Sequence, residues 1–128
     1  SERKARHLIG YLMTLGVNDF KFYEPWKSEE FKNADIERGA KIYKEYCVQC
    51  HGKNGGGDGP GARGLNPKPA IHNKLPLNDY PDDYLYNLIF YGGKSVGKSP
   101  NMPDWGMTLS KQSLADVIAY LRSNFKGE

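Results

Sequence analysis

The stretch Cys47-Val48-Gln49-Cys50-His51 places two cysteines and a histidine within about one helical turn, and this spacing limits what the chain can bind. The order C-x-x-C-H is typical of covalent heme attachment. Each thiol can add across one vinyl group of a heme, and His51 then lies beneath the iron as an axial ligand. The motif therefore predicts one heme c, bound covalently through Cys47 and Cys50 and ligated by His51.

Two other uses of paired cysteines fit the rest of the chain less well. A thioredoxin-like dithiol is expected at the start of a helix that follows a strand, within a βαβ pattern, and no such pattern is visible in the sequence. A structural zinc site needs four nitrogen or sulfur ligands. With two cysteines and three histidines, it would have to use His7 or His72 from distant positions.

Length and composition agree with a cofactor-containing domain. The 128 residues fit one small domain, and only 38% of them are hydrophobic, so a large apolar cofactor would add to a limited core. Heme is attached to such motifs outside the bacterial cytoplasm, which predicts a periplasmic or otherwise extracytoplasmic location. Because the chain begins at Ser1 rather than Met, we expect that an upstream segment was removed. The apolar run near the N-terminus is too short to span a bilayer, so no membrane span is expected.

The charge balance bears on partners. The net charge is +3, and two heme propionates would nearly cancel it, so nucleic acid, which calls for a concentrated basic face, is not an expected partner. Several lysines fall in segments expected to surround the heme: Lys53, Lys68, Lys74, Lys94 and Lys98. They are either a solvated surface or a docking rim for an acidic redox partner.

Helical patterns predict three helices, and no stretch alternates with period two, so the fold class is all-α. The first helix is expected over 34–47 with Asn33 as its cap, the second over 82–91, and the third over 111–124 with Ser110 as its cap. One stripe of the first helix should be buried: Ile36, Ala40, Tyr43 and Cys47. Gly39 flanks this stripe, which indicates a close approach of the third helix. The long connection over 52–80 would be unusual in a compact domain, but a heme supplies a surface on which it can pack.

The other face of the iron needs a ligand from a downstream loop. Met102 stands between prolines that stiffen its backbone, and we expect its thioether to be the ligand. Met107 could also serve, or could fill the core. His72 would give a bis-histidine heme, or is a surface imidazole. A His/Met pair leaves no open position on the iron, which predicts electron transfer by a protein that is not itself an enzyme.

The ordered set of motifs resembles the small class I c-type cytochromes of bacteria. The resemblance covers 36–126 and includes Arg38-Gly39-Ala40, the heme motif, Gly57-Asp58-Gly59-Pro60, Met102-Pro103-Asp104-Trp105 and Ile118-Ala119-Tyr120-Leu121-Arg122. It implies the cytochrome c fold, with helices packed around a covalently attached heme. It also implies that Gly39 and Tyr43 cross the last helix near Tyr120 and that Met102 is the distal ligand.

The resemblance implies further cofactor contacts. A proline carbonyl in the loop after the heme motif usually accepts a hydrogen bond from the axial histidine. Pro60 is the candidate, with Pro67 or Pro69 as alternatives. Arg63 and Trp105 are candidate partners of the heme propionates, or else a solvated charge and a packing aromatic.

The chain is expected to consist of an N-terminal extension over 1–32 and a cytochrome c domain over 33–128. The stretch over 7–15 looks similar to the closing helix and resembles the tail of a preceding cytochrome domain. The chain would then be the last domain of a longer multiheme protein. The alternative is an added helix packed on a monoheme core.

Three functions compete. The first is a one-electron carrier between redox partners outside the cytoplasm. The second is an electron-entry or electron-exit domain of a larger oxidoreductase complex. The third is a heme sensor or peroxidase, which needs a vacant or labile distal site.

Overall fold

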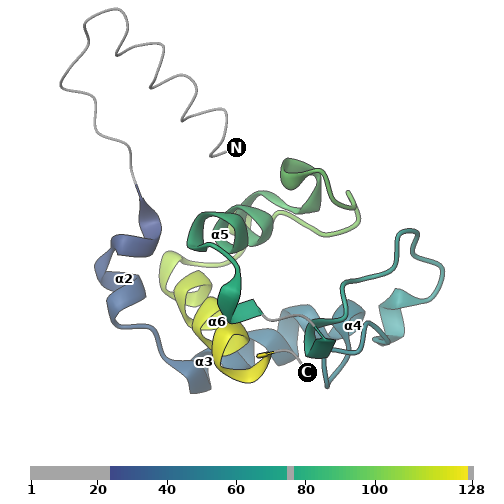
Figure 1. The fold of residues 1–128 in the computed structure, drawn as a ribbon, viewed down its shortest axis with the longest axis horizontal. Helices are drawn as coiled ribbons and strands as arrows, with labels where there is room; N and C mark the ends of the chain where they lie inside the picture. Colours follow the sequence, from purple (N-terminus) through teal and green to yellow (C-terminus); the bar gives the residue numbers. More distant parts are fainter. Residues whose placement is uncertain (1–23, 75–76, 127–128) are drawn as a thin grey trace, which may run out of the picture.

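The computed structural model describes residues 24–74 and 77–126, and these residues are helical with no strand (Figure 1). The α-helices are α2 (Glu29–Lys32), α3 (Ile36–Ile42), α4 (Val48–His51), α5 (Asp82–Tyr91) and α6 (Lys111–Asn124). The predicted all-α fold is confirmed. The predicted helix near the N-terminus lies outside the described residues. Within the described part, no helix combines the length and apolar character that a membrane span requires.

The first predicted helix is longer than expected and has another cap. A π-helical turn over Tyr43–Cys47 joins α3 to α4, so the chain stays helical over 36–51. The expected cap, Asn33, is wrong, because Asn33 ends α2 instead. Asp35 caps α3: its carboxylate accepts a hydrogen bond of 2.8 Å from the Arg38 N–H.

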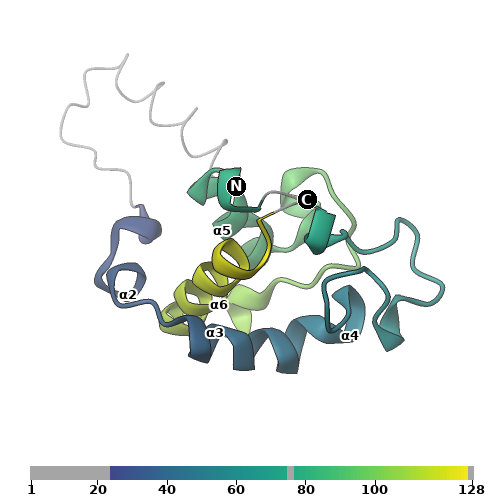
Figure 2. The same ribbon diagram turned by 60° about the horizontal axis from the view of Figure 1, so that its bottom comes forward.

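The close approach predicted at Gly39 is confirmed. Helix α6 crosses α3 there (Figure 2), and a Cβ at Gly39 would collide with the backbone carbonyl of Asp116. Tyr43, one turn later, is 2% exposed and packs on Tyr120 with ring centroids 5.3 Å apart. The predicted burial of Ile36 is wrong, since Ile36 is 48% exposed.

The space beside α6 near Ile36 is occupied by a polar network around the buried Asp116. Its carboxylate accepts hydrogen bonds from the Asp35 N–H at 2.8 Å, the Arg38 Nε at 2.8 Å and the Gln112 Nε2 at 3.0 Å. Burial on its own raises the pKa of Asp116, but these hydrogen bonds, with that of Arg38 the largest, hold the pKa below its ordinary value. The network ties the first turn of α3 to α6.

The other two helices match their predicted bounds. Helix α6 begins after Ser110, whose hydroxyl accepts a hydrogen bond of 3.1 Å from the Ser113 N–H. Helix α5 ends at Tyr91 and is followed by Gly92, whose φ of +87° lies in the left-handed region that favours glycine. The core side chains that these helices share with the 36–51 helix include Tyr43, Leu85, Ile89, Leu114, Val117, Ile118 and Leu121.

The segment before α3 packs on the domain. Trp26 and Phe31 place their rings 6.2 and 6.1 Å from the ring of Tyr86 on α5. Gln112 of α6 donates a hydrogen bond of 2.9 Å to the carbonyl of Glu30. Residues 24–33 therefore cover α5 and α6. The predicted boundary between residues 32 and 33 stays a prediction.

Candidate cofactor site

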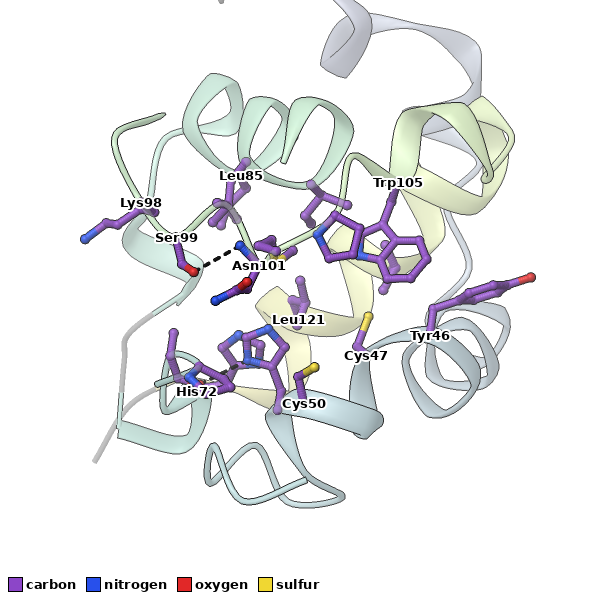
Figure 3. A pocket seen from close by; sticks show the side chains of 18 of the residues that line it. Tyr46, Cys47, Cys50, His72, Leu85, Lys98, Ser99, Asn101, Trp105 and Leu121 are labelled. Carbon is purple, nitrogen blue, oxygen red and sulfur yellow. Dashed lines mark hydrogen bonds between the residues drawn. The ribbon is translucent and has the colours of Figure 1, made fainter. Parts of the chain in front are cut away.

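A cavity of about 350 Å³ lies between the helix that carries the C-x-x-C-H motif, the loop after it, α5, α6 and the loop over 98–105 (Figure 3). This volume falls in the range of small-molecule sites. Most of its walls are aromatic or aliphatic: Tyr43, Tyr46, Leu65, Leu77, Tyr80, Tyr84, Leu85, Leu88, Ile89, Trp105, Leu109, Val117 and Leu121 are among the lining residues. The cavity is thus bounded by the hydrophobic core itself.

Both motif cysteines open into this cavity. Cys47 ends the π-helical turn and Cys50 lies in α4, and Figure 3 shows both sulfurs pointing inward. Both thiols are free and line the cavity. Burial, and then the neighbouring Cys50, raise the pKa of Cys47 to about 12, so its thiol is neutral at pH 7.

His51 is held by one backbone group. It is 8% exposed, and its Nδ1–H donates a hydrogen bond of 3.1 Å to the carbonyl of Ala70. A bond at Nδ1 leaves Nε2 available to a metal and fixes the ring orientation. Burial lowers the pKa of His51, and the hydrogen bond to Ala70 opposes this shift.

His72 also lines the cavity, beside His51 rather than opposite it. The two imidazoles stack with centroids 4.0 Å apart and an angle of 20° between their planes. Burial, and then the nearby His51, lower the pKa of His72 to about 3, so its ring is neutral at pH 7. Two axial histidines would have to approach an iron from opposite faces, whereas these two rings stack directly on each other. His72 is half-buried, so the alternative of a surface imidazole is wrong.

The two candidate methionines are in different surroundings. Met102 is half-buried and lines the cavity. Its carbonyl accepts a hydrogen bond of 3.2 Å from the Gly93 N–H, which attaches its loop to the end of α5. Met107 is 82% exposed, so the alternative that it fills the core is wrong. Only Met102 of these two faces the cavity.

The donor set fits a heme. Two free thiols, an imidazole with an available Nε2 and a thioether converge on an apolar cavity, and thioether and imidazole are the ligands of high-potential hemes. The porphyrin would fill space that core side chains leave between them.

The family model described as cytochrome C oxidase, cbb3-type, subunit III matches residues 34–121. The chain belongs to this family of c-type cytochrome domains. Membership implies heme c as the cofactor and electron transfer as the function.

Curated relatives of this cytochrome domain are parts of larger proteins. A nicotinate dehydrogenase subunit of Pseudomonas putida is 28% identical over 101 residues, which cover 75% of this chain and 8% of that protein. The cytochrome c subunits of the quinone alcohol dehydrogenases of Gluconacetobacter polyoxogenes and Komagataeibacter europaeus are each 28% identical over 92 residues. These matches cover 68% of this chain and 18% of those proteins. The cytochrome domain therefore spans less than a fifth of the length of these relatives.

The expectation that a proline carbonyl accepts the hydrogen bond from His51 is wrong. The acceptor is Ala70, not Pro60, Pro67 or Pro69. Pro60 begins a short 3-10 turn over Pro60–Ala62 that packs against α4, whereas the loop at Ala70 returns over the His51 ring. Sequence reasoning missed Ala70 because any residue can supply a backbone carbonyl. Its position one residue after Pro69 was the nearest available signal.

The two candidate propionate partners lie in different places. Trp105 is half-buried, lines the cavity and packs its ring edge-on to Tyr46 with centroids 5.5 Å apart. Arg63 is exposed and does not line the cavity. Propionate binding by either residue stays a prediction.

Two of the five lysines singled out from the sequence stand at the cavity. Lys68 and Lys98 line it and are exposed, and Figure 3 shows the ammonium group of Lys98 pointing away from the interior. The other three, Lys53, Lys74 and Lys94, are exposed but do not line the cavity.

Proposed function

We propose that this cytochrome domain carries one electron at a time on a single heme c, bound covalently to Cys47 and Cys50 with His51 and Met102 as axial ligands. The observation that supports this most strongly is the convergence of both thiols, the His51 ring and the Met102 segment on one apolar cavity. Bound heme supplies a metal that alternates between Fe(III) and Fe(II).

The residues of the chain then have separate roles. The Ala70 carbonyl orients His51 so that Nε2 faces the cavity. The attachment of the Met102 loop to Gly93 holds the thioether segment at the cavity wall. Apolar walls exclude water, which favours the less charged state of the site and raises its potential. A ligand on each side leaves no position for oxygen or substrate.

We further propose that the domain exchanges electrons with another redox protein outside the cytoplasm. Its relatives include the cytochrome c subunits of quinone alcohol dehydrogenases and a protein of a nicotinate dehydrogenase. On this proposal the chain is the electron-entry or electron-exit domain of a dehydrogenase complex. It would receive electrons from a catalytic partner and would not itself transform the substrate. The exposed Lys68 and Lys98 at the cavity rim suit an acidic docking face on that partner.

The test is the visible spectrum of the purified holoprotein, together with Met102→Ala and Met107→Ala. Ferric heme with a thioether ligand has a weak long-red absorption band. We expect this band in the wild type, its loss in Met102→Ala and its retention in Met107→Ala, because Met107 is exposed.

The same samples test the competing sensor or peroxidase function. If the reduced wild type bound carbon monoxide rapidly at neutral pH, the distal site would be open or labile and the electron-carrier proposal would fail. We expect slow or no binding in the wild type and rapid binding in Met102→Ala.

A further inference from the structure

The surroundings of His51 contain a second histidine that the motif does not account for. His72 comes 21 positions after His51 in the chain, and its ring stacks on the His51 ring with centroids 4.0 Å apart. A ring in this position prevents rotation of the His51 imidazole about its Cβ–Cγ bond. The Ala70 hydrogen bond holds one edge of the His51 ring, and His72 covers one face.

His72 is itself fixed from several sides. The Tyr43 hydroxyl lies 3.1 Å from His72 Nδ1, a hydrogen bond in either tautomer of the imidazole. The Phe125 ring lies 5.5 Å from the His72 ring. Tyr43 is 2% exposed and Phe125 is 3% exposed, so both supports belong to the buried core.

The backbone allows this arrangement only because residue 55 is glycine. Gly55 has φ of +68°, and a Cβ there would lie 2.9 Å from the Cβ of His72. The Asn73 N–H donates a hydrogen bond of 3.3 Å to the Gly55 carbonyl. The loop after α4 thus holds the His72 segment against the motif helix.

We propose that His72 is a positioning residue for the axial ligand His51, and that Tyr43 acts on His51 through His72. The inference rests on the proposed heme ligation by His51. The stacked ring sets the plane of the axial imidazole, while the Tyr43 hydroxyl sets the position of the stacked ring. Because the plane of an axial imidazole distributes the unpaired electron over the ferric porphyrin, this geometry governs the spectroscopic pattern of the heme.

The experiment measures the paramagnetically shifted heme methyl resonances of the ferric holoprotein by NMR, and the solvent exchange of the His51 Nδ1–H proton in the reduced protein. In His72→Ala we expect loss of the wild-type methyl pattern and exchange about tenfold faster, the effect of weakening one hydrogen bond. Tyr43→Phe should shift the methyl resonances less and in the same direction. The matched control is Lys74→Ala, an exposed side chain in the same short turn, which should keep the wild-type pattern.

A double variant tests whether Tyr43 influences His51 through His72. The Tyr43 hydroxyl also lies 3.5 Å from the Gly52 carbonyl, a longer hydrogen bond than that to His72. Because Tyr43 acts chiefly through His72, adding Tyr43→Phe to His72→Ala should therefore add only a small further shift. An equal additional shift in the double variant would overturn the proposal, as would a wild-type pattern in His72→Ala. If His72→Ala does not fold with heme, His72→Phe decides instead, since it keeps a stacked ring and loses Nδ1. The expected result there is a shift like that of Tyr43→Phe, and an unchanged pattern would overturn the proposal.

The inference and the function on which it rests can fail separately. A wild type without the long-red band would remove Met102 as a ligand and reject the proposed electron carrier, whereas the role of His72 needs only ligation by His51 and would still be decided by the variants. A wild type with the band, combined with variants that keep the wild-type methyl pattern and proton exchange, would leave the electron carrier intact and reject only the role of His72.

Discussion

Single residues decide how closely the chain packs around the site. Gly39 lets the α6 backbone approach α3 closely. The Tyr43 hydroxyl, one turn further along, lies 3.1 Å from His72 Nδ1. The same tyrosine packs on Tyr120 and Phe125 with centroid distances of 5.3 and 5.5 Å. The helix crossing and the contact with His72 therefore share one side chain.

Gly39→Ala tests the crossing. In an exposed helix this change would stabilise by up to about 1 kcal/mol. Here the added methyl group meets the Asp116 carbonyl, so the helices must separate, and we expect a net loss of about 2 kcal/mol in the free energy of unfolding. Urea unfolding monitored by circular dichroism measures it. Lys41→Ala, an exposed change on the same helix, should stay within about 0.5 kcal/mol of the wild type, and equal stability of the two variants would contradict the close crossing.

At the scale of elements, α3 and α6 are joined by charge as well as by packing. The Asp116 side chain is nearly inaccessible to solvent. Its carboxylate is nevertheless fully hydrogen-bonded, because the Asp35 backbone N–H, the Arg38 guanidinium and the Gln112 amide all donate to it. A buried carboxylate without such donors would be strongly destabilising. The same network selects Asp35 as the cap of α3.

This network predicts a specific pH dependence. The folded pKa of Asp116 lies below its ordinary value of 3.8, so its stabilising contribution is complete above that value and is lost as the pH falls through the folded pKa. Asp116→Asn should lower the free energy of unfolding at pH 7 by about 2 kcal/mol and should lose less stability than the wild type between pH 5 and about 2. Chemical unfolding at a series of pH values measures both effects.

The control for that series is Glu37→Gln, an exposed carboxylate on the same helix. It should retain the acid-dependent loss seen in the wild type. If Asp116→Asn and Glu37→Gln followed the same pH profile, the contribution assigned to Asp116 would be wrong.

At the scale of the whole molecule, the net charge is only +3, but two of the lysines, Lys68 and Lys98, lie at the rim of the cavity. Charges at the rim of a redox site act chiefly on the rate of association, and salt screens them. An electron would enter or leave past this rim, where the exposed Pro67, Asn101 and Pro103 also line the cavity.

Reversing both rim charges tests this arrangement. Reduced Lys68→Glu/Lys98→Glu should be oxidised severalfold more slowly than the wild type by the anionic complex hexacyanoferrate(III) at low ionic strength, and the difference should shrink as salt is added. Stopped-flow absorbance measures the rate. The control Lys41→Glu/Lys44→Glu has the same net charge but alters exposed positions that do not line the cavity. Equal slowing in both double variants would show that only net charge matters.

Local patterns in the sequence determined much of this protein. The bounds of α5 and α6 follow from caps and glycines within a few residues. The C-x-x-C-H spacing marks the two thiols and His51, all of which the structure brings to one cavity. Met102 was separable from Met107 because its flanking prolines mark it locally. These features depend on neighbours in the chain, which a sequence displays directly.

Tertiary structure alone decided the contacts around these features. The Ala70 carbonyl reaches His51 across 19 positions, and the Arg38 guanidinium reaches Asp116 across 78. Sequence-based expectations placed the first bond at Pro60 and the first cap at Asn33, and buried Ile36, all incorrectly. A backbone carbonyl has no residue-type signature, and periodicity marks a buried face without saying which partner covers it. The path of the loop and the crossing of α3 with α6 supply that information, because they set which distant groups come within hydrogen-bonding distance.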